Sequence, residues 1–314
     1  MDMQRSLVQG TYIVLTGNIV NTFIAEAAYR EQIGITEKII ALQKEQIKIT
    51  EQQVEAGTTP YANVLTLISQ LNVSEAALPP LKQRLAQTEH LLATLSGRSP
   101  AEWVSLDAGF DELTLPDHLP LSLPTELIKQ RPDILAAEAQ LHSASADIGV
   151  ATAALFPSFT LNAGYGQNSM SMNTLFKSNS NFWSTGANLD VPLFNGGTLL
   201  SQRQSAIEGY NVSLANYRQT VLSAFAQVAD TLTALEHDAE SLDAQSRGLS
   251  TAEDALQLTQ ANYQAGMVND LQLIIANEQY LQAKIGYIES KTQRFQDTVV
   301  FFVALGGGWW NAAQ

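Results

Sequence analysis

The fold is decided by residues 207–242, IEGYNVSLANYRQTVLSAFAQVADTLTALEHDAESL, where apolar side chains recur at steps of three and four. Ten such steps cover 35 residues, and the mean of 3.5 is the period of a coiled-coil seam. Leu249, Leu256 and Tyr263 continue the stripe at sevens, and no proline interrupts residues 198–267. We therefore predict one helix of about 65 residues, roughly 97 Å long. The stripe consists of Ile207, Tyr210, Leu214, Tyr217, Val221, Phe225, Val228, Leu232, Leu235, Ala239 and Leu242.

The chain around this helix is an internal repeat. Glu55-Ala56-Gly57 is matched 209 residues later by Gln264-Ala265-Gly266, and a long helical stretch precedes each copy. About forty helical residues follow each turn and end in glycine, at residues 94–97 and 304–307. These ends match best at an offset of 210, so we expect a slip of one residue. The repeat predicts two helical hairpins.

Prolines divide the segments that run back along the long helix. Residues 60–97 read as a helix that Pro79-Pro80 should kink or split. Residues 98–123 are irregular, and residues 124–154 read as a second helical stretch. Pro132 breaks that stretch and starts a new first turn, with Asp133 near the positive end of the helix dipole. The two stretches together match the long helix in length, so they can return antiparallel to it.

Two segments of about ten residues alternate with a period of two, as strands do. Each has a long apolar face and a small polar face, which suits a strand between lipid and an aqueous lumen. A strand pair in a soluble sheet alternates in the same way. The linking segment, residues 167–181, is rich in Ser and Asn and suits an extracellular loop. The apolar faces carry Phe159, Leu161, Ala163 and Tyr165 in one strand, and Trp183, Thr185, Ala187, Leu189, Val191 and Leu193 in the other.

Composition excludes several classes of function. Charged residues make up 15% of the 314 residues and the net charge is −14, so the chain lacks the basic clusters that nucleic acids require. There is no cysteine, which removes disulfides, thiol catalysis and cysteine-based metal sites. We expect no transmembrane helix, because no run of about 18 apolar residues occurs. The four histidines show no metal-ligand spacing, so we expect no enzyme, metal or cofactor.

Five short motifs occur in order and together resemble one family of proteins. They are Leu123-Pro124-Thr125-Glu126-Leu127, Arg131-Pro132-Asp133-Ile134, Phe156-Pro157-Ser158, residues 191–197 (VPLFNGG) and residues 304–309 (ALGGGW). Nearly the whole chain is similar to the TolC/OprM-type outer membrane factors. The similarity is to the lipoprotein, NodT-like branch that serves resistance–nodulation–division efflux pumps.

The resemblance implies a homotrimer with a twelve-stranded barrel in the outer membrane and a helical barrel across the periplasm. It also implies passive export of drugs or small toxic compounds, driven by an inner-membrane pump through a periplasmic adaptor. By the repeat arithmetic Met1 corresponds to Tyr210, inside a long helix. We therefore expect an N-terminally truncated gene or a fragment, without signal peptide, lipidated cysteine or first strand pair. Three such chains would supply six strands.

The resemblance places the channel gate and the adaptor contacts at the helical tips. Leu271 is expected to form an apolar constriction. The family often carries an aspartate nine residues after the turn glycine, where this chain has Ile275. Asp270 is then either one member of a trimeric acidic ring or a solvated tip residue. The expected adaptor contacts are Gly57, Thr58, Gly266 and Met267, although both glycines also suit a plain helix hairpin.

We thus predict a mainly α fold with a small β part, acting as an outer-membrane efflux channel subunit. The alternative is a soluble elongated coiled-coil structural protein. The predicted organisation is a first-repeat helical hairpin (1–97), an equatorial segment (98–123), an upper return helix (124–154), a barrel strand pair (155–198), a second-repeat hairpin (199–305) and a C-terminal tail (306–314).

Overall fold

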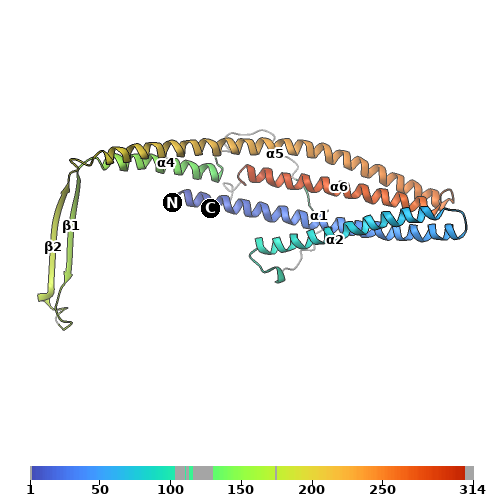
Figure 1. Cartoon of the computed structure of the whole chain (residues 1–314), viewed down its shortest axis with the longest axis horizontal. Coiled ribbons are helices and arrows are strands. Elements are labelled where there is room, and N and C mark those ends of the chain that lie inside the picture. Colours follow the sequence, from blue (N-terminus) through green and yellow to red (C-terminus); the bar gives the residue numbers. More distant parts are fainter. Residues whose placement is uncertain (1, 103–109, 111–112, 116–129, 174, 308–314) are drawn as a thin grey trace. The chain divides into compact units, whose positions relative to one another are not determined.

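The computed structural model describes residues 2–102, 110, 113–115, 130–173 and 175–307. It is mainly helical with one two-stranded sheet, which confirms the predicted fold class (Figure 1). Residues 7–132 with 223–314, and residues 1–6 with 133–222, form two units, which are described separately. The elements are α1 (Asp2–Glu55), α2 (Tyr61–Leu95), η1 (Pro100–Glu102), α4 (Pro132–Ala153), β1 (Ser158–Gln167), η3 (Ser178–Ser180), β2 (Asn181–Asp190), α5 (Thr198–Gln264) and α6 (Asp270–Ala304).

The internal repeat is visible in the helix boundaries. Both α2 and α6 have 35 residues, and each boundary of α6 lies 209 positions after that of α2. The offset is thus 209 at both ends, and the predicted slip to 210 is wrong. Gly97 and Gly306 are equivalent because each donates to a carbonyl three residues earlier, at 3.0 and 2.9 Å. The offset of 210 paired Gly97 with Gly307, which is possible only because a second glycine follows Gly306.

The first hairpin, α1–α2, is joined by ion pairs at heptad spacing. Arg30 pairs with Glu89 at 3.1 Å, Lys82 with Glu37 at 2.8 Å and Lys44 with Glu75 at 2.7 Å. The α1 members are seven residues apart, and so are the α2 members, in reverse order. This regularity is that of an antiparallel coiled coil and agrees with the 3.5-residue period found in the sequence.

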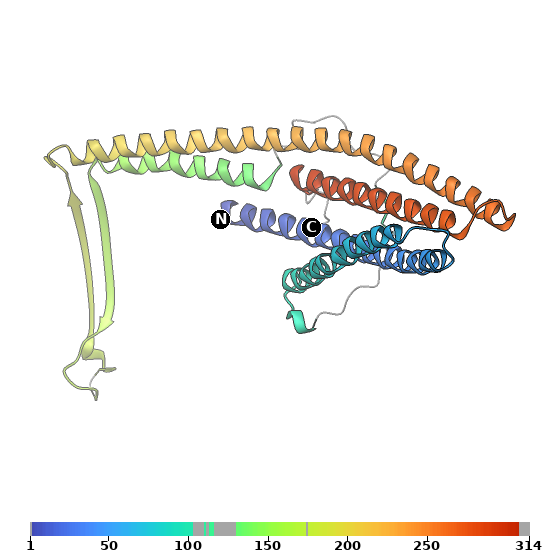
Figure 2. The ribbon, with the colours of Figure 1, turned by 45° about the vertical axis from the view of Figure 1, so that its right-hand side comes forward.

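The centre of the same unit is the seam between α1 and α6. Leu281, Ile288 and Phe295 are buried at intervals of seven on α6 and belong to one cluster with Ile24 and Ile35 of α1. Lys284 pairs with Glu31 at 2.8 Å across this seam. On α5, the predicted stripe is buried at Val228, Leu235 and Leu256. Figures 1 and 2 show α6 running beside α5 in the second hairpin.

Helix α2 continues through Pro79-Pro80, so the predicted split at these prolines does not occur. Both prolines and the residues four before them, Glu75 and Ala76, are exposed. The carbonyls that lose an amide donor can therefore bond to water, which lowers the cost of an internal proline. The ion pairs of Glu75 and Lys82 also join α2 to α1 on either side of the prolines.

Two side chains attach the connecting segments to the helices of the unit formed by residues 7–132 and 223–314. Phe110, from the equatorial segment, is 6% exposed and packs edge-to-face on Phe295 with ring centroids 6.1 Å apart. Arg131 is 7% exposed and donates to the Ala304 carbonyl at 2.6 Å and to Gln227 Oε1 at 2.9 Å. Most of the predicted equatorial segment, residues 124–129 and the end of the C-terminal tail lie outside the described residues.

The other unit contains α4, the sheet and the start of α5. Helix α4 begins at Pro132, as predicted, and the Asp133 carboxylate accepts from the Ile134 amide at 3.0 Å. Arg203 of α5 lies 3.3 Å from Thr152 Oγ1 of α4, and Figures 1 and 2 show α4 running alongside α5. Strand β2 ends at Asp190, before Pro192, which cannot donate to a strand ladder.

One helix of the described chain, residues 3–55 of α1, is long and apolar enough to cross a membrane, by length and composition only. The expectation of no such helix was therefore wrong by this criterion. Only 17% of its apolar window is buried. Farther along α1, Arg30, Glu37 and Lys44 pair with α2, and such charged contacts belong in water rather than in lipid.

Candidate functional site

The two hairpin tips are built by the same backbone device. At the first tip, Gly57 has a φ of 72° and donates to the Val54 carbonyl at 2.9 Å, while Thr58 donates to the Gln53 carbonyl at 2.9 Å. At the second tip, Gly266 has a φ of 74°, and Gly266 and Met267 make the equivalent bonds, both at 2.9 Å. Only glycine adopts this left-handed conformation readily. The predicted role of these glycines in ending the helices is thus confirmed.

The side chains differ between the tips. At the first tip, the Thr58 hydroxyl also donates to the Gln53 carbonyl, at 2.9 Å. Helix α2 then starts after Pro60 without a side-chain cap. At the second, the Asn269 side chain caps α6 by accepting from the Gln272 amide at 3.0 Å. The residue that opens α2 is Tyr61, whereas the residue that opens α6 is Asp270.

Asp270 is exposed and interacts with the other helix of its own hairpin. The Tyr263 hydroxyl on the last turn of α5 interacts with its carboxylate. This interaction, through hydrogen bonding and through the negative charge of Asp270, raises the pKa of the Tyr263 hydroxyl. Sequence reasoning missed this contact. The available signal was Tyr263 at the end of the heptad stripe, seven residues before Asp270 and across a tight turn.

The two apolar gate candidates lie on the first turns of α6. Leu271 is half-buried and Ile275 is 39% exposed, while Ile274 between them is 5% exposed and belongs to the core. All four predicted adaptor contacts, Gly57, Thr58, Gly266 and Met267, are exposed. The Met267 side chain is 69% exposed. The second tip thus gathers a carboxylate, a half-buried leucine and an exposed thioether within a few residues.

The sheet carries the second functional feature, a separation of apolar residues from small polar ones between its two faces over most of its length. In its antiparallel register Phe159 pairs with Leu189, Leu161 with Ala187, Ala163 with Thr185 and Tyr165 with Trp183. The alternate pairs join Ser158 to Asp190, Thr160 to Asn188, Asn162 to Gly186, Gly164 to Ser184 and Gly166 to Phe182, so Phe182 is a large apolar residue on the otherwise small and polar face. Residues that pair directly share a face. The predicted facing is therefore confirmed for residues 159–165 and 183–189, and Leu161, Tyr165 and Trp183 are each more than 70% exposed. Val191 and Leu193, which were predicted on the same face, lie beyond the end of β2 at Asp190.

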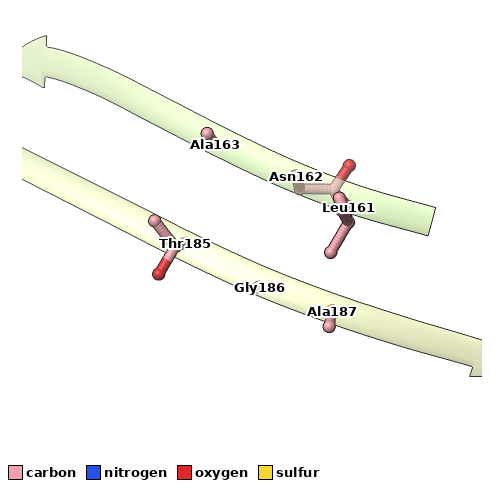
Figure 3. Close-up of a pocket in the computed structure, with 6 residues that line it drawn as sticks. All are labelled: Leu161, Asn162, Ala163, Thr185, Gly186 and Ala187. Atoms are coloured by element: carbon pink, nitrogen blue, oxygen red, sulfur yellow. The ribbon is translucent and has the colours of Figure 1, made fainter.

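The middle of this sheet is hollowed by small residues. The hollow is lined by Leu161, Asn162, Ala163, Thr185, Gly186 and Ala187 (Figure 3). All six belong to the two paired strands, and Gly186 contributes no side chain opposite Asn162. Because both faces of this sheet are exposed, the hollow is an open surface and not an enclosed ligand pocket.

Helical hairpins with heptad seams, joined to a strand pair with one mostly apolar exposed face, define a membrane-channel type of subunit. The outer membrane efflux protein family matches residues 123–307, and the chain belongs to that family. The predicted family and the outer-membrane location are confirmed. The family consists of transport proteins and is not a family of enzymes.

Similar proteins agree on this assignment. The chain is 30% identical over 304 residues to the probable outer membrane lipoprotein SilC of Salmonella typhimurium, covering 96% of this chain and 65% of that protein. It is 30% identical over 303 residues to the outer membrane protein OprJ of Pseudomonas aeruginosa, covering 95% and 62%. The chain therefore spans less than two thirds of the length of these relatives.

Solved structures show the same fold. The outer-membrane channel OprN superposes with a TM-score of 0.83 at 27% identity, covering 98% of this chain and 69% of that chain. The CusC channel superposes with a TM-score of 0.78 at 25% identity, covering 98% and 71%.

Proposed function

We propose that the protein is a subunit of an outer-membrane duct that passively exports drugs or other small toxic compounds. In this proposal three copies assemble, a periplasmic adaptor contacts the helical tips, and an inner-membrane pump supplies the energy. The observation that carries the proposal is the pairing register of β1 and β2. A sheet with one mostly apolar face and one face of mostly small or polar residues fits a wall between lipid and water.

The need for further strands supports assembly of several copies. Two strands leave unpaired backbone groups along both outer edges, and lipid offers no water to satisfy them. The edges must therefore pair with strands of other copies or of a longer chain. The relatives' names do not select a cargo, since they refer to pyoverdine, to cations and to toluene at similar identity. We therefore assign the choice of cargo to the pump.

Within this duct we propose that Asp270, Leu271 and Ile275 form the gate at the second tip. Three Asp270 carboxylates around a narrow axis would attract cations, and Leu271 would narrow the passage beside them. The interaction with Tyr263 supports a second role, in which Asp270 holds α5 and α6 together at the tip. Gly57, Thr58, Gly266 and Met267 are exposed where an adaptor would reach the tips.

The absence of cysteine from the sequence permits a direct test of the membrane proposal. Leu161→Cys and Asn162→Cys place single thiols on opposite faces of the sheet. In cells that produce the protein from its own gene, we expect a membrane-impermeant maleimide to label Asn162→Cys and to spare Leu161→Cys. Detergent should make both thiols reactive. Equal labelling of both thiols without detergent would contradict the duct and favour the soluble coiled-coil alternative.

Planar-bilayer recordings of the trimer test the gate. Asp270→Ala should weaken cation selectivity and block by divalent cations, whereas Leu271→Ser should raise resting conductance. Tyr263→Phe removes the hydroxyl that interacts with Asp270 but keeps the Asp270 charge, so it should raise conductance without loss of selectivity. Unchanged selectivity and block in Asp270→Ala would exclude Asp270 from the filter.

A further inference from the structure

A pair of carboxyl groups lies between α5 and α6, far along both helices from the tip. Asp238 is on α5 and Asp297 is on α6, and both side chains are partly buried. Asp238 Oδ2 is enclosed by protein and receives no hydrogen bond from a donor among the described residues. Asp297 nevertheless acts on this carboxyl group, through a hydrogen bond and through its charge, and both effects raise the pKa of Asp238. Two carboxylates have no hydrogen to share, so a bond between them exists only when one holds a proton.

The neighbouring charged groups are already committed to other partners. Arg294 of α6 donates a hydrogen bond to the Leu235 carbonyl on α5. His237, on the same helix as Asp238, lies 3.4 Å from Glu240. Gln293 donates to Asp297 Oδ2 at 2.8 Å, which leaves the other carboxylate oxygen of Asp297 for a further contact. Arg294 and His237 both favour the charged form of Asp238, but their effect is the smaller one.

Protonation of this pair falls in a mild pH range. Partial burial, the hydrogen bond with Asp297 and the charge of Asp297 together raise the pKa of Asp238 from 3.8 to about 6. The pKa is raised on folding, so the paired state is stabilised at low pH. That stabilisation is lost as the pH rises through about 6. Above that pH, two negative charges face each other across the helix contact and repel.

We propose that Asp238 and Asp297 form a proton-operated latch that tightens α5 against α6 in mildly acidic surroundings and loosens the contact at neutral pH. The latch lies within one structural unit, because residues 223–314 belong together. It requires no lipid and no second copy of the chain, so it can be tested independently of the proposed transport function. In a duct, such a latch would make the movement of the second hairpin sensitive to external pH.

The neighbouring contacts show where the latch acts. Ser290 Oγ bonds to Ser241 Oγ at 3.1 Å, one helical turn beyond Asp238. On the other side Phe301 is 1% exposed and packs in a cluster with Val228 and Leu235. The carboxyl pair therefore lies between a polar bridge and an apolar cluster, and a change in its charge affects the packing of both.

Hydrogen exchange of the purified full chain in detergent tests the latch. Amide protection in residues 294–301, corrected for intrinsic exchange rates, should increase from pH 7.5 to pH 5 by up to about tenfold, and by less where solvent screens the pair. Asp238→Asn keeps a donor facing Asp297 without the charge. It should show at pH 7.5 the protection that the parent reaches only in acid, and little further change with pH.

Two further variants make the test decisive. Asp297→Asn should abolish the pH dependence in the same way, from the opposite helix. Asp254→Asn removes an exposed carboxylate elsewhere on α5 and should leave the parent's pH dependence intact. The proposal is overturned if the parent shows no pH dependence in residues 294–301. It is also overturned if both Asp238→Asn and Asp297→Asn retain the parent's dependence.

Discussion

Replacing Arg131 with alanine should destabilise the unit formed by residues 7–132 and 223–314 more than most single substitutions do. Arg131 precedes α4, but its guanidinium is buried and bonds to the last residue of α6 and to the middle of α5. Ala304 ends α6, so its carbonyl lies at the negative end of that helix dipole. The Arg131 side chain therefore donates to the Ala304 carbonyl, one of the carbonyls at the end of α6 that lack a partner within the helix. It also places a positive charge at the negative end of α6 and bonds to Gln227 of α5.

The magnitude follows from the two hydrogen bonds. Each involves a charged donor, and such bonds contribute about 1.5–3 kcal/mol. Water can reach part of the space that the side chain leaves, so the two losses do not add fully. We expect Arg131→Ala to lower the free energy of unfolding by about 3–4 kcal/mol. Arg131→Lys keeps the positive charge but cannot reach both acceptors in fixed geometry, and should lose about half as much.

Urea denaturation in detergent, followed by far-ultraviolet circular dichroism, measures these differences. Arg218→Ala, at an exposed position on α5, is the matched control and should change stability by less than about 0.5 kcal/mol. A loss below about 1 kcal/mol for Arg131→Ala would refute the reasoning, since it would mean that neither hydrogen bond contributes beyond what water provides.

Two further predictions concern the sheet and the first hairpin. Leu161→Arg should impair membrane assembly by about 2–4 kcal/mol, because Leu161 is nearer the middle of its strand. Leu189 is one residue from the end of β2, so Leu189→Arg should cost only about 0–1 kcal/mol. Asn162→Arg, on the polar face, should assemble normally, and heat-modifiable trimers on gels report all three. Lys44→Glu should destabilise the α1–α2 hairpin by up to about 1 kcal/mol, and adding Glu75→Lys should restore it, as a double-mutant cycle of melting temperatures can show. A double variant that is no more stable than Lys44→Glu alone would mean that this ion pair does not stabilise the hairpin.

The sequence predicted the features that repeat and missed those that depend on a single tertiary contact. Heptad spacing identified the burial of Val228 and Leu235, and strict alternation identified the two faces of the sheet. A period of this kind is a property of the chain itself. The ion pair of Lys44 with Glu75 also obeys the period. Its partners become evident only once the antiparallel register of α1 and α2 is known.

Predictions made from neighbouring residues alone were wrong or incomplete where solvent exposure or tertiary contacts determined the structure. Pro79-Pro80 predicted a break, but exposure of the freed carbonyls and pairing on either side keep α2 continuous. Arg131 was identified within a motif, yet its partners lie 96 and 173 residues away, a distance that no pattern in the sequence encodes. The interaction between Tyr263 and Asp270 spans a short turn, but it depends on the orientation of two side chains.

The repeat itself argues that the two tips perform different tasks. With an offset of 209, Asp270 corresponds to Tyr61 and Tyr263 corresponds to Val54. At these two positions the first tip carries a tyrosine and a valine, so it cannot form the equivalent contact between a hydroxyl and a carboxylate. The backbone turns are otherwise the same, with matching glycine geometry and matching bonds. Because only the side chains differ, a change that breaks the Tyr263–Asp270 contact should loosen the second hairpin and leave the first one closed.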